Sequence, residues 1–238
     1  MKIQLARSTF LGLQYFGGKR QLAPSYPPPQ RGKIIEPFCG GAAYSWLYWD
    51  RDVRINDVNE RLIAVYRYLQ AASPQDILAL PRLQTGQAIS EILYLSDAER
   101  DLLRLFCHFG SGGATWRDKV SPQGAQDVKA FRLPLARNLH KMRHWTITSG
   151  SYLDLPNDDA TWFVDPPYIV AGKMYEHHRI DYPQLAAWCR SRRGQVIVCE
   201  NQGATWLPFR PFRVVHNGVM KPNKEVLWHR PAREPVHA

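Results

Sequence analysis

The feature that most constrains this chain is an apolar run that ends in an acidic, proline-rich tetrapeptide. Residues 160–164 read Ala-Thr-Trp-Phe-Val, a composition that predicts a buried parallel strand. The two prolines that follow have no N–H to donate to a neighbouring strand, so the strand must end there. Ligands of open α/β sheets bind just beyond the carboxyl ends of the strands. We therefore expect the tetrapeptide Asp165-Pro166-Pro167-Tyr168 to lie at a ligand site.

This tetrapeptide suits a planar ligand that carries an amine. The Asp165 carboxylate and the Pro166 carbonyl can each accept one N–H of an NH₂ group, and the Tyr168 ring can stack on a heterocycle. The alternative is a proline-rich turn in which Asp165 only caps the backbone. The rest of the chain must decide between the two.

Composition points to a folded, basic protein. With 238 residues and 45% hydrophobic content, the chain can bury a substantial core as one domain or as one domain with an insertion. Its formal net charge of +10 favours a polyanionic partner. The four cysteines show neither a CxxC pair nor metal-ligand spacing, so we expect reduced thiols in a cytoplasmic protein and no metal. The first residues contain no long apolar stretch, so we expect no signal peptide and no membrane span.

Two short strands, each followed by a helix, predict a site for an adenosine-type ligand. The first runs from Lys33 into the turn Glu36-Pro37-Phe38-Cys39-Gly40, and the second runs from Val53 to Asp57. Glycines between a strand and a helix admit a nucleotide to the amino end of the helix. An acid at the end of the second strand is placed to bind ribose hydroxyls. The alternative for Asp57 is a helix N-cap.

Near the amino terminus, Tyr15-Phe16-Gly17-Gly18-Lys19 forms a loop whose backbone can approach a ligand closely. The Lys19 ammonium could meet a carboxylate or a phosphate. Taken alone, this loop indicates a site only weakly.

Residues 73–145 interrupt the alternation of strands and helices. Helical patterns cover 74–80 and 96–109, and a glycine-rich loop with Trp116 follows. Residues 100–145 carry nine Lys or Arg against three Asp. A solvated helical face is one explanation, but a basic insertion in an α/β core more often binds a polyanion. The cations that we expect to contact a polyanion are Arg117, Lys119, Arg132, Arg137, Lys141 and Arg143.

The remaining segments complete an α/β pattern. Strands are expected at 145–149 and 195–199, a hairpin at 212–216 with 225–229, and a helix at 182–193 that Gly194 caps. Residues 169–180 have the composition of a loop. His177 and His178 could suggest a metal site, but no third ligand has suitable spacing, so we expect a solvated loop. The tail from 231 to 238 is expected to be disordered.

Together these blocks resemble, over about residues 8–229, the Dam-type (D12 class) DNA adenine-N6 methyltransferases of prokaryotes and phages. The blocks occur in that family's order: residues 15–19, 36–40, 56–59 (Asn-Asp-Val-Asn) and 165–168. Only the last is highly specific in this setting. The resemblance implies an α/β fold with a seven-stranded, Rossmann-like mixed sheet and a small, mainly helical recognition insertion. It also implies S-adenosyl-L-methionine as methyl donor and the N6 amine of a flipped adenine in double-stranded DNA as acceptor, within the cytoplasm.

The resemblance also assigns residues and domains. Residues 165–168 would be catalytic. The cofactor contacts would be Tyr15, Phe16, Gly17, Lys19, Glu36, Pro37, Phe38, Gly40, Asp57 and Asp165. Residues 1–72 and 146–230 would form the catalytic domain, and 73–145 the insertion that recognises target DNA.

One position departs from the family, and two other functions stay open. The family usually has a second glycine where this chain has Ala42, so we expect the adjacent Gly41 to absorb the geometry of the turn. An amino methyltransferase of cytosine or RNA is disfavoured by Asp165, because cytosine enzymes commonly have Ser there. A catalytically silent DNA-binding module is disfavoured by the intact tetrapeptide. Neither the target sequence nor the oligomeric state follows from the sequence.

Overall fold

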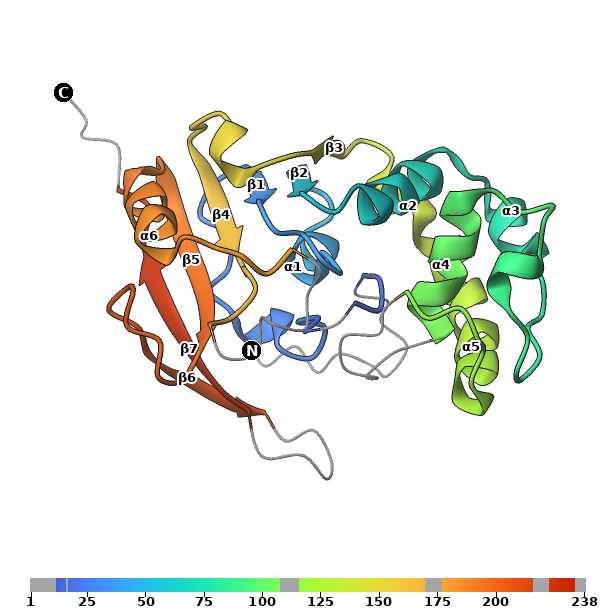
Figure 1. The fold of residues 1–238 in the computed structure, drawn as a ribbon. Helices are drawn as coiled ribbons and strands as arrows, with labels where there is room; N and C mark the ends of the chain where they lie inside the picture. The colour runs from blue at the N-terminus through green and yellow to red at the C-terminus, as the bar shows by residue number, and fades with distance from the viewer. Residues whose placement is uncertain (1–11, 16, 108–115, 170–176, 216–222, 234–238) are drawn as a thin grey trace.

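A computed structural model describes residues 12–15, 17–107, 116–169, 177–215 and 223–233. Figure 1 shows a sheet with flanking helices, and a group of helices (α3, α4 and α5) at one end of the molecule. Among the described residues, we find no helix that is long and apolar enough to cross a membrane.

In the described part of the chain, seven strands form one sheet in the order β3-β2-β1-β4-β5-β7-β6 (Figure 1). The strands are β1 Lys33–Glu36, β2 Asp52–Asp57, β3 Thr146–Ser149, β4 Ala160–Val164, β5 Gly194–Asn201, β6 Arg210–Val215 and β7 Asn223–Arg230. The strands β1 to β5 pair in parallel, whereas β7 is antiparallel to both β5 and β6. This arrangement confirms the predicted seven-stranded mixed sheet.

The strand order reverses between β1 and β4. From β1 the chain continues outward to β2 and β3, and it then returns to β4 and β5 on the other side. Parallel strands bring their carboxyl ends to one edge of the sheet, and ligands bind at the crevice where the order reverses. The ends of β1, β2 and β4 are therefore the positions where a site is expected.

Helices cover both faces of the sheet. Side chains alternate along each strand, so the apolar strands present side chains that must be buried on both faces. On β4, Phe163 packs into one buried cluster, while Trp162 and Val164 pack into the other. The first cluster includes side chains of α1 and α2, and the second includes those of α6. The helices that flank the sheet are α1 Ala43–Leu47 and α2 Glu60–Ala71 on one face and α6 Tyr182–Ser191 on the other, with 3-10 turns at Ala23–Ser25 and Tyr152–Asp154.

The insertion between α2 and β3 is helical, as predicted. Its helices are α3 Pro74–Ala79, α4 Asp97–Cys107 and α5 Pro122–Asn138, with 3-10 turns at Ile89–Glu91 and Leu139–Met142. The sequence did not predict α5, which contains Pro134 in its interior. Proline removes one backbone hydrogen bond from a helix. The helix nevertheless continues past it, and the Asn138 side chain donates to the Pro134 carbonyl at 2.7 Å.

Two expectations for the carboxyl-terminal part need correction. Gly194 does not cap α6, which ends at Ser191, but opens β5 with a φ of +84°. A Cβ at Gly194 would lie 2.2 Å from the Ala160 carbonyl oxygen, so glycine permits the close approach to β4. Residues 231–233, which we assigned to a disordered tail, are described, and the Ala232 N–H donates to Gln30 Oε1 at 2.8 Å. Residues 234–238 lie outside the described residues.

Candidate active site

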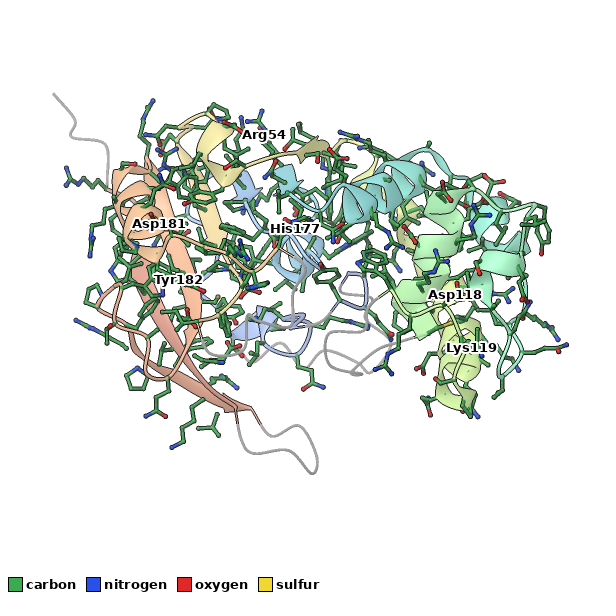
Figure 2. All side chains as sticks on the ribbon, in the orientation of Figure 1. Arg54, Asp118, Lys119, His177, Asp181 and Tyr182 are labelled. Atoms are coloured by element: carbon green, nitrogen blue, oxygen red, sulfur yellow. The ribbon has the colours of Figure 1, made fainter. Side chains whose placement is uncertain are left out.

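Acidic side chains from the ends of three strands line one hollow of about 720 Å³. Glu36 ends β1, Asp57 ends β2, and Asp165 follows β4. The hollow therefore lies at the edge where the strand order reverses. Several residues predicted to bind the cofactor also line it, namely Tyr15, Gly17, Lys19, Phe38 and Gly40. His177, labelled in Figure 2, lines it as well and is exposed in a loop, as expected.

Glycines let the amino-terminal segment lie directly on the turn after β1. The Leu13 N–H donates to the Gly41 carbonyl at 3.1 Å. A Cβ at Gly12 would lie 2.0 Å from that carbonyl oxygen, and a Cβ at Gly41 would lie 2.6 Å from the Leu13 carbonyl oxygen. No side chain fits between the two segments, so this contact brings residues 15–19 to the hollow.

The turn itself corrects our expectation for Gly41. Gly40 and Ala42 have positive φ values of +44° and +51°, and Gly41 is not in that region. Ala42 thus adopts the left-handed conformation itself, which costs a non-glycine residue roughly 1–2 kcal/mol. The turn is therefore built with an alanine in a glycine conformation.

Lys19 contacts the predicted catalytic tetrapeptide and its neighbour Glu225. Its ammonium lies 2.8 Å from Asp165 Oδ2, 3.7 Å from Glu225 Oε1 and 4.8 Å from the centroid of the Tyr168 ring. The Lys19 side chain is only 7% exposed. Sequence analysis assigned Lys19 to the cofactor, and the structure adds a direct ion pair with the predicted catalytic acid.

The second carboxylate oxygen of Asp165 is available for a ligand. Asp165 Oδ1 is buried and has no hydrogen-bond partner among the described residues. The neighbouring backbone is fixed on two sides, because the Tyr182 hydroxyl donates to the Pro167 carbonyl at 2.8 Å and the Ile169 N–H donates to Glu200 Oε2 at 3.3 Å. Asp165 Oδ1 is thus a buried acceptor on a backbone segment that is held by hydrogen bonds, and it suits an N–H donor from a bound molecule.

Tyr168 contacts an acid that sequence analysis missed. Its hydroxyl donates to Glu225 Oε1 at 3.3 Å, and the Tyr26 hydroxyl donates to Glu225 Oε2 at 2.7 Å. Burial raises the pKa of Glu225, and the nearby Lys19 ammonium opposes that rise. The Tyr168 ring is 8% exposed and points toward β7, whereas Asp165 and Pro167 line the hollow. The available signal was a single acid within the apolar pattern of residues 225–229.

Glu36 is buried beneath the glycine turn. Its Oε1 accepts the Ser45 N–H of α1 at 2.7 Å, and burial raises its pKa to about 8. A carboxyl with this pKa is mostly protonated at neutral pH, and a cation bound in the hollow would favour its ionised form.

Asp57 joins the turn to α2. Its Oδ2 accepts the Gly40 N–H at 3.2 Å, and its Oδ1 accepts the Asn59 N–H at 3.0 Å. Burial raises the pKa of this carboxyl. The alternative in which Asp57 caps α2 is wrong, because Asn59 is the N-cap and its side chain accepts the Arg61 and Leu62 N–H groups.

Two other predicted site residues, Pro37 and Pro166, do not line the hollow. Pro37 is buried behind the turn, where its carbonyl accepts the Asn56 side-chain N–H at 3.2 Å. Pro166 is buried within the tetrapeptide. Phe16 lies outside the described residues.

The predicted DNA-contacting cations fall into two groups. Arg117, Lys119 and Arg137 are exposed. Arg132 instead donates to the Pro81 carbonyl at 2.8 Å, and Arg143, although it is also exposed, donates to carbonyls at the end of α2, including those of Gln70 and Ala72. Lys141 lies 5.5 Å from the centroid of the Trp49 ring. Arg132 therefore supports the insertion, Arg143 supports the end of α2, and Lys141 contacts the segment between α1 and β2.

An ionic network fixes the segment that carries Arg117 and Lys119. Asp101 on α4 binds Arg61 of α2 at 2.5 Å and Arg104 at 2.8 Å. Arg104 in turn binds Asp118 at 2.7 Å, between the two exposed cations. Figure 2 shows Asp118 and Lys119 in the insertion, at the opposite end of the molecule from Tyr182.

Comparisons with known proteins point to one family. Residues 15–102 match the model described as D12 class N6 adenine-specific DNA methyltransferase. The type II methyltransferase M1.LlaDCHI of Lactococcus lactis subsp. cremoris is 34% identical over 91 residues, which are 37% of this chain and 32% of that protein. The chain therefore matches about a third of that relative's length.

A solved structure of an rRNA methyltransferase, aviRa from Streptomyces viridochromogenes, aligns with 83% of this chain and 76% of its own chain, at 14% identity and a TM-score of 0.36. The family match covers the loop at residues 15–19, the turn at residues 36–40 and Asp57. The tetrapeptide at residues 165–168 lies beyond it. Over residues 15–102, this chain is therefore similar to the D12 class N6 adenine-specific DNA methyltransferases.

Proposed function

We propose that this protein is a site-specific DNA methyltransferase that transfers a methyl group to the exocyclic N6 amine of adenine in double-stranded DNA in the cytoplasm. One observation carries the proposal: Asp165 presents a buried oxygen without a partner beside a hollow lined by family-matched residues. An amine is the kind of group that such an acceptor would bind.

The residues of the hollow fit S-adenosyl-L-methionine. When bound, this molecule supplies an electrophilic methyl group on a sulfonium and leaves as S-adenosylhomocysteine. Asp57 would accept hydrogen bonds from the ribose hydroxyls, and a cationic ligand in the hollow would favour the ionised form of the buried Glu36 carboxyl. The close contact of Gly12 with Gly41 supports this fit, because it brings Tyr15 and Gly17 to the same hollow as the turn.

The chain contributes mainly positioning. Asp165 Oδ1 would accept one N–H of the target amine and the Pro166 carbonyl the other. These bonds favour a pyramidal nitrogen whose lone pair is aimed at the methyl carbon, and after transfer the methylated nitrogen would release its extra proton to Asp165 Oδ1. Holding two reactants in line can contribute on the order of 7–11 kcal/mol. Lys19 is paired with Asp165 Oδ2, so Oδ1 is the carboxylate oxygen that would receive the amine.

The base must leave the duplex to reach Asp165, at a cost of roughly a few kcal/mol. Stacking on the Tyr168 ring would offset part of that cost, and it requires the ring to turn away from Glu225. The exposed Arg117, Lys119 and Arg137 of the insertion would contact the DNA backbone and at least one base edge.

The proposal is tested by mapping modified adenines in the DNA of a methylase-free host that expresses the protein. We expect N6-methyladenine at one sequence motif with the wild-type protein and none with Asp165→Ala. Unmodified DNA from cells that contain folded wild-type protein would contradict the proposal.

A further inference from the structure

The end of β5 carries a second buried acceptor without a partner. Asn201 is the last residue of that strand, and its side-chain Oδ1 is buried and unpaired within the described part of the chain. Most buried polar side-chain atoms in folded proteins have a hydrogen-bond partner, so each exception requires an explanation. A ligand that supplies the missing partner is one such explanation.

The sheet register brings Asn201 beside the catalytic residues. Asn201 lies directly opposite Glu225 in the antiparallel pair of β5 and β7. Side chains of directly opposed residues share a face of the sheet, with Cβ atoms about 4.5–5.5 Å apart. Glu225 in turn accepts the Tyr168 hydroxyl and lies 3.7 Å from the Lys19 ammonium.

Residues on either side of Asn201 agree with this location. Cys199, two residues earlier on the same face, belongs to the buried cluster that contains Tyr168. Glu200 accepts the N–H of Ile169, the residue that follows the tetrapeptide. Asn201 thus lies on the β5–β7 side of the catalytic loop, whereas the hollow opens toward β1 and β2.

We propose that Asn201 is a base-contact residue that binds the edge of the extruded adenine. The proposal rests on the proposed function. The side-chain oxygen of Asn201 would accept the same N6 hydrogen that the Pro166 carbonyl accepts. The side-chain NH₂ of Asn201 would donate to the ring nitrogen N7. An Asn side chain has the geometry for this paired contact with adenine.

This contact gives a physical basis for selecting adenine. Cytosine also presents an amine beside a ring acceptor, so the Watson–Crick side does not separate the two bases by hydrogen bonding. Where adenine has N7 next to its amine, cytosine has a C–H. The side-chain N–H of Asn201 would then have no acceptor. A buried donor without a partner disfavours binding.

The test compares DNA copied with dATP and DNA copied with 7-deaza-dATP, in which N7 is replaced by C–H. Methyl transfer is measured as kcat/KM for the wild-type protein, Asn201→Ala and Asn201→Asp, with Gln202→Ala as the matched control on the adjacent exposed residue. Wild type and control should lose about tenfold or more on the deaza DNA. Both Asn201 variants should have a lower kcat/KM than the wild type on normal DNA. Their kcat/KM should fall little further on the deaza DNA.

The affinity for S-adenosylmethionine, measured by calorimetry, monitors folding of each variant and should stay within about threefold of the wild type. An equal deaza penalty in wild type and Asn201→Ala overturns the proposal, and so does a wild-type protein that shows no penalty. If wild type binds the cofactor but methylates no adenine, the proposed function fails and the base contact falls with it.

Discussion

Lys19 Nζ lies 2.8 Å from Asp165 Oδ2, so an ion pair joins the amino-terminal loop to the tetrapeptide that we propose is catalytic. The Asp165 side chain is 19% exposed and that of Lys19 7%. A pair in such a setting is screened less by water than a surface pair. The pair leaves the other carboxylate oxygen free for a substrate amine.

Replacing Lys19 by Met should lower both stability and activity, because it leaves the Asp165 carboxylate without its cation. Breaking a buried pair typically costs about 3–5 kcal/mol, which is an upper bound for this partly exposed one. Adding Asp165→Asn to Lys19→Met should restore stability but not activity. Chemical denaturation and methyl-transfer assays of both variants check this, and additive stability losses would show that the two residues are not coupled.

Replacing Glu36 by Gln should change how stability depends on pH. The pKa of Glu36 is raised from 4.5 to about 8 by burial, so its contribution is complete below pH 4.5 and is lost as the pH rises through about 8. Glutamine keeps the acceptor for the Ser45 N–H and does not titrate. The variant should therefore gain stability relative to wild type between these pH values. Thermal unfolding of the wild type and the variant is measured from pH 5 to 9. A difference in stability between the two that stays constant over this range would refute this account.

Replacing Asp57 by Ala should weaken cofactor binding about ten- to hundredfold, the effect of losing a hydrogen bond to a charged group. DNA affinity should change little, because Asp57 lies at the end of β2 and away from the insertion. Asp52→Ala, at the exposed other end of β2, is the control. Calorimetry with S-adenosylmethionine and a DNA-binding assay separate the effects, and equal losses for both ligands would indicate misfolding.

The cations of the insertion should divide into two kinds. Arg117→Ala or Arg137→Ala should weaken DNA binding and reduce the salt slope by about one unit if the side chain contacts a phosphate, or relax discrimination at one position by roughly 1–3 kcal/mol if it contacts a base. Arg132→Ala should instead lower the melting temperature, because Arg132 bonds the Pro81 carbonyl, and should leave the salt slope unchanged. Binding of target and scrambled duplexes across a salt series measures both. Wild-type behaviour of Arg117→Ala and Arg137→Ala would mean that DNA is bound elsewhere.

Sequence patterns predicted the parts of the fold that depend on local chemistry. The alternation and termination of apolar runs located β4, β2 and the tetrapeptide, because strand burial and proline chemistry act within a few residues. Helix α5 was missed because Pro134 argues against a helix, and tertiary packing can outweigh local propensity.

The contacts of the site depended on residues distant in sequence. The Lys19–Asp165 pair, the position of Glu225 and the orphan oxygen of Asn201 arise from strand order and register, which no local pattern encodes. Ala42 was misjudged for a different reason: the turn takes its left-handed residue at that position even though a glycine stands beside it.

The most direct test of the account is a nucleoside analysis by mass spectrometry. Purified wild-type protein and Asp165→Ala are incubated with S-adenosylmethionine and with either duplex DNA or RNA, and the products are digested. We predict N6-methyldeoxyadenosine from the duplex with the wild-type protein, at least about a hundredfold less with Asp165→Ala, and no methylated nucleoside from RNA. Methylated cytosine, methylated RNA, or equal product from Asp165→Ala would contradict adenine methylation at Asp165.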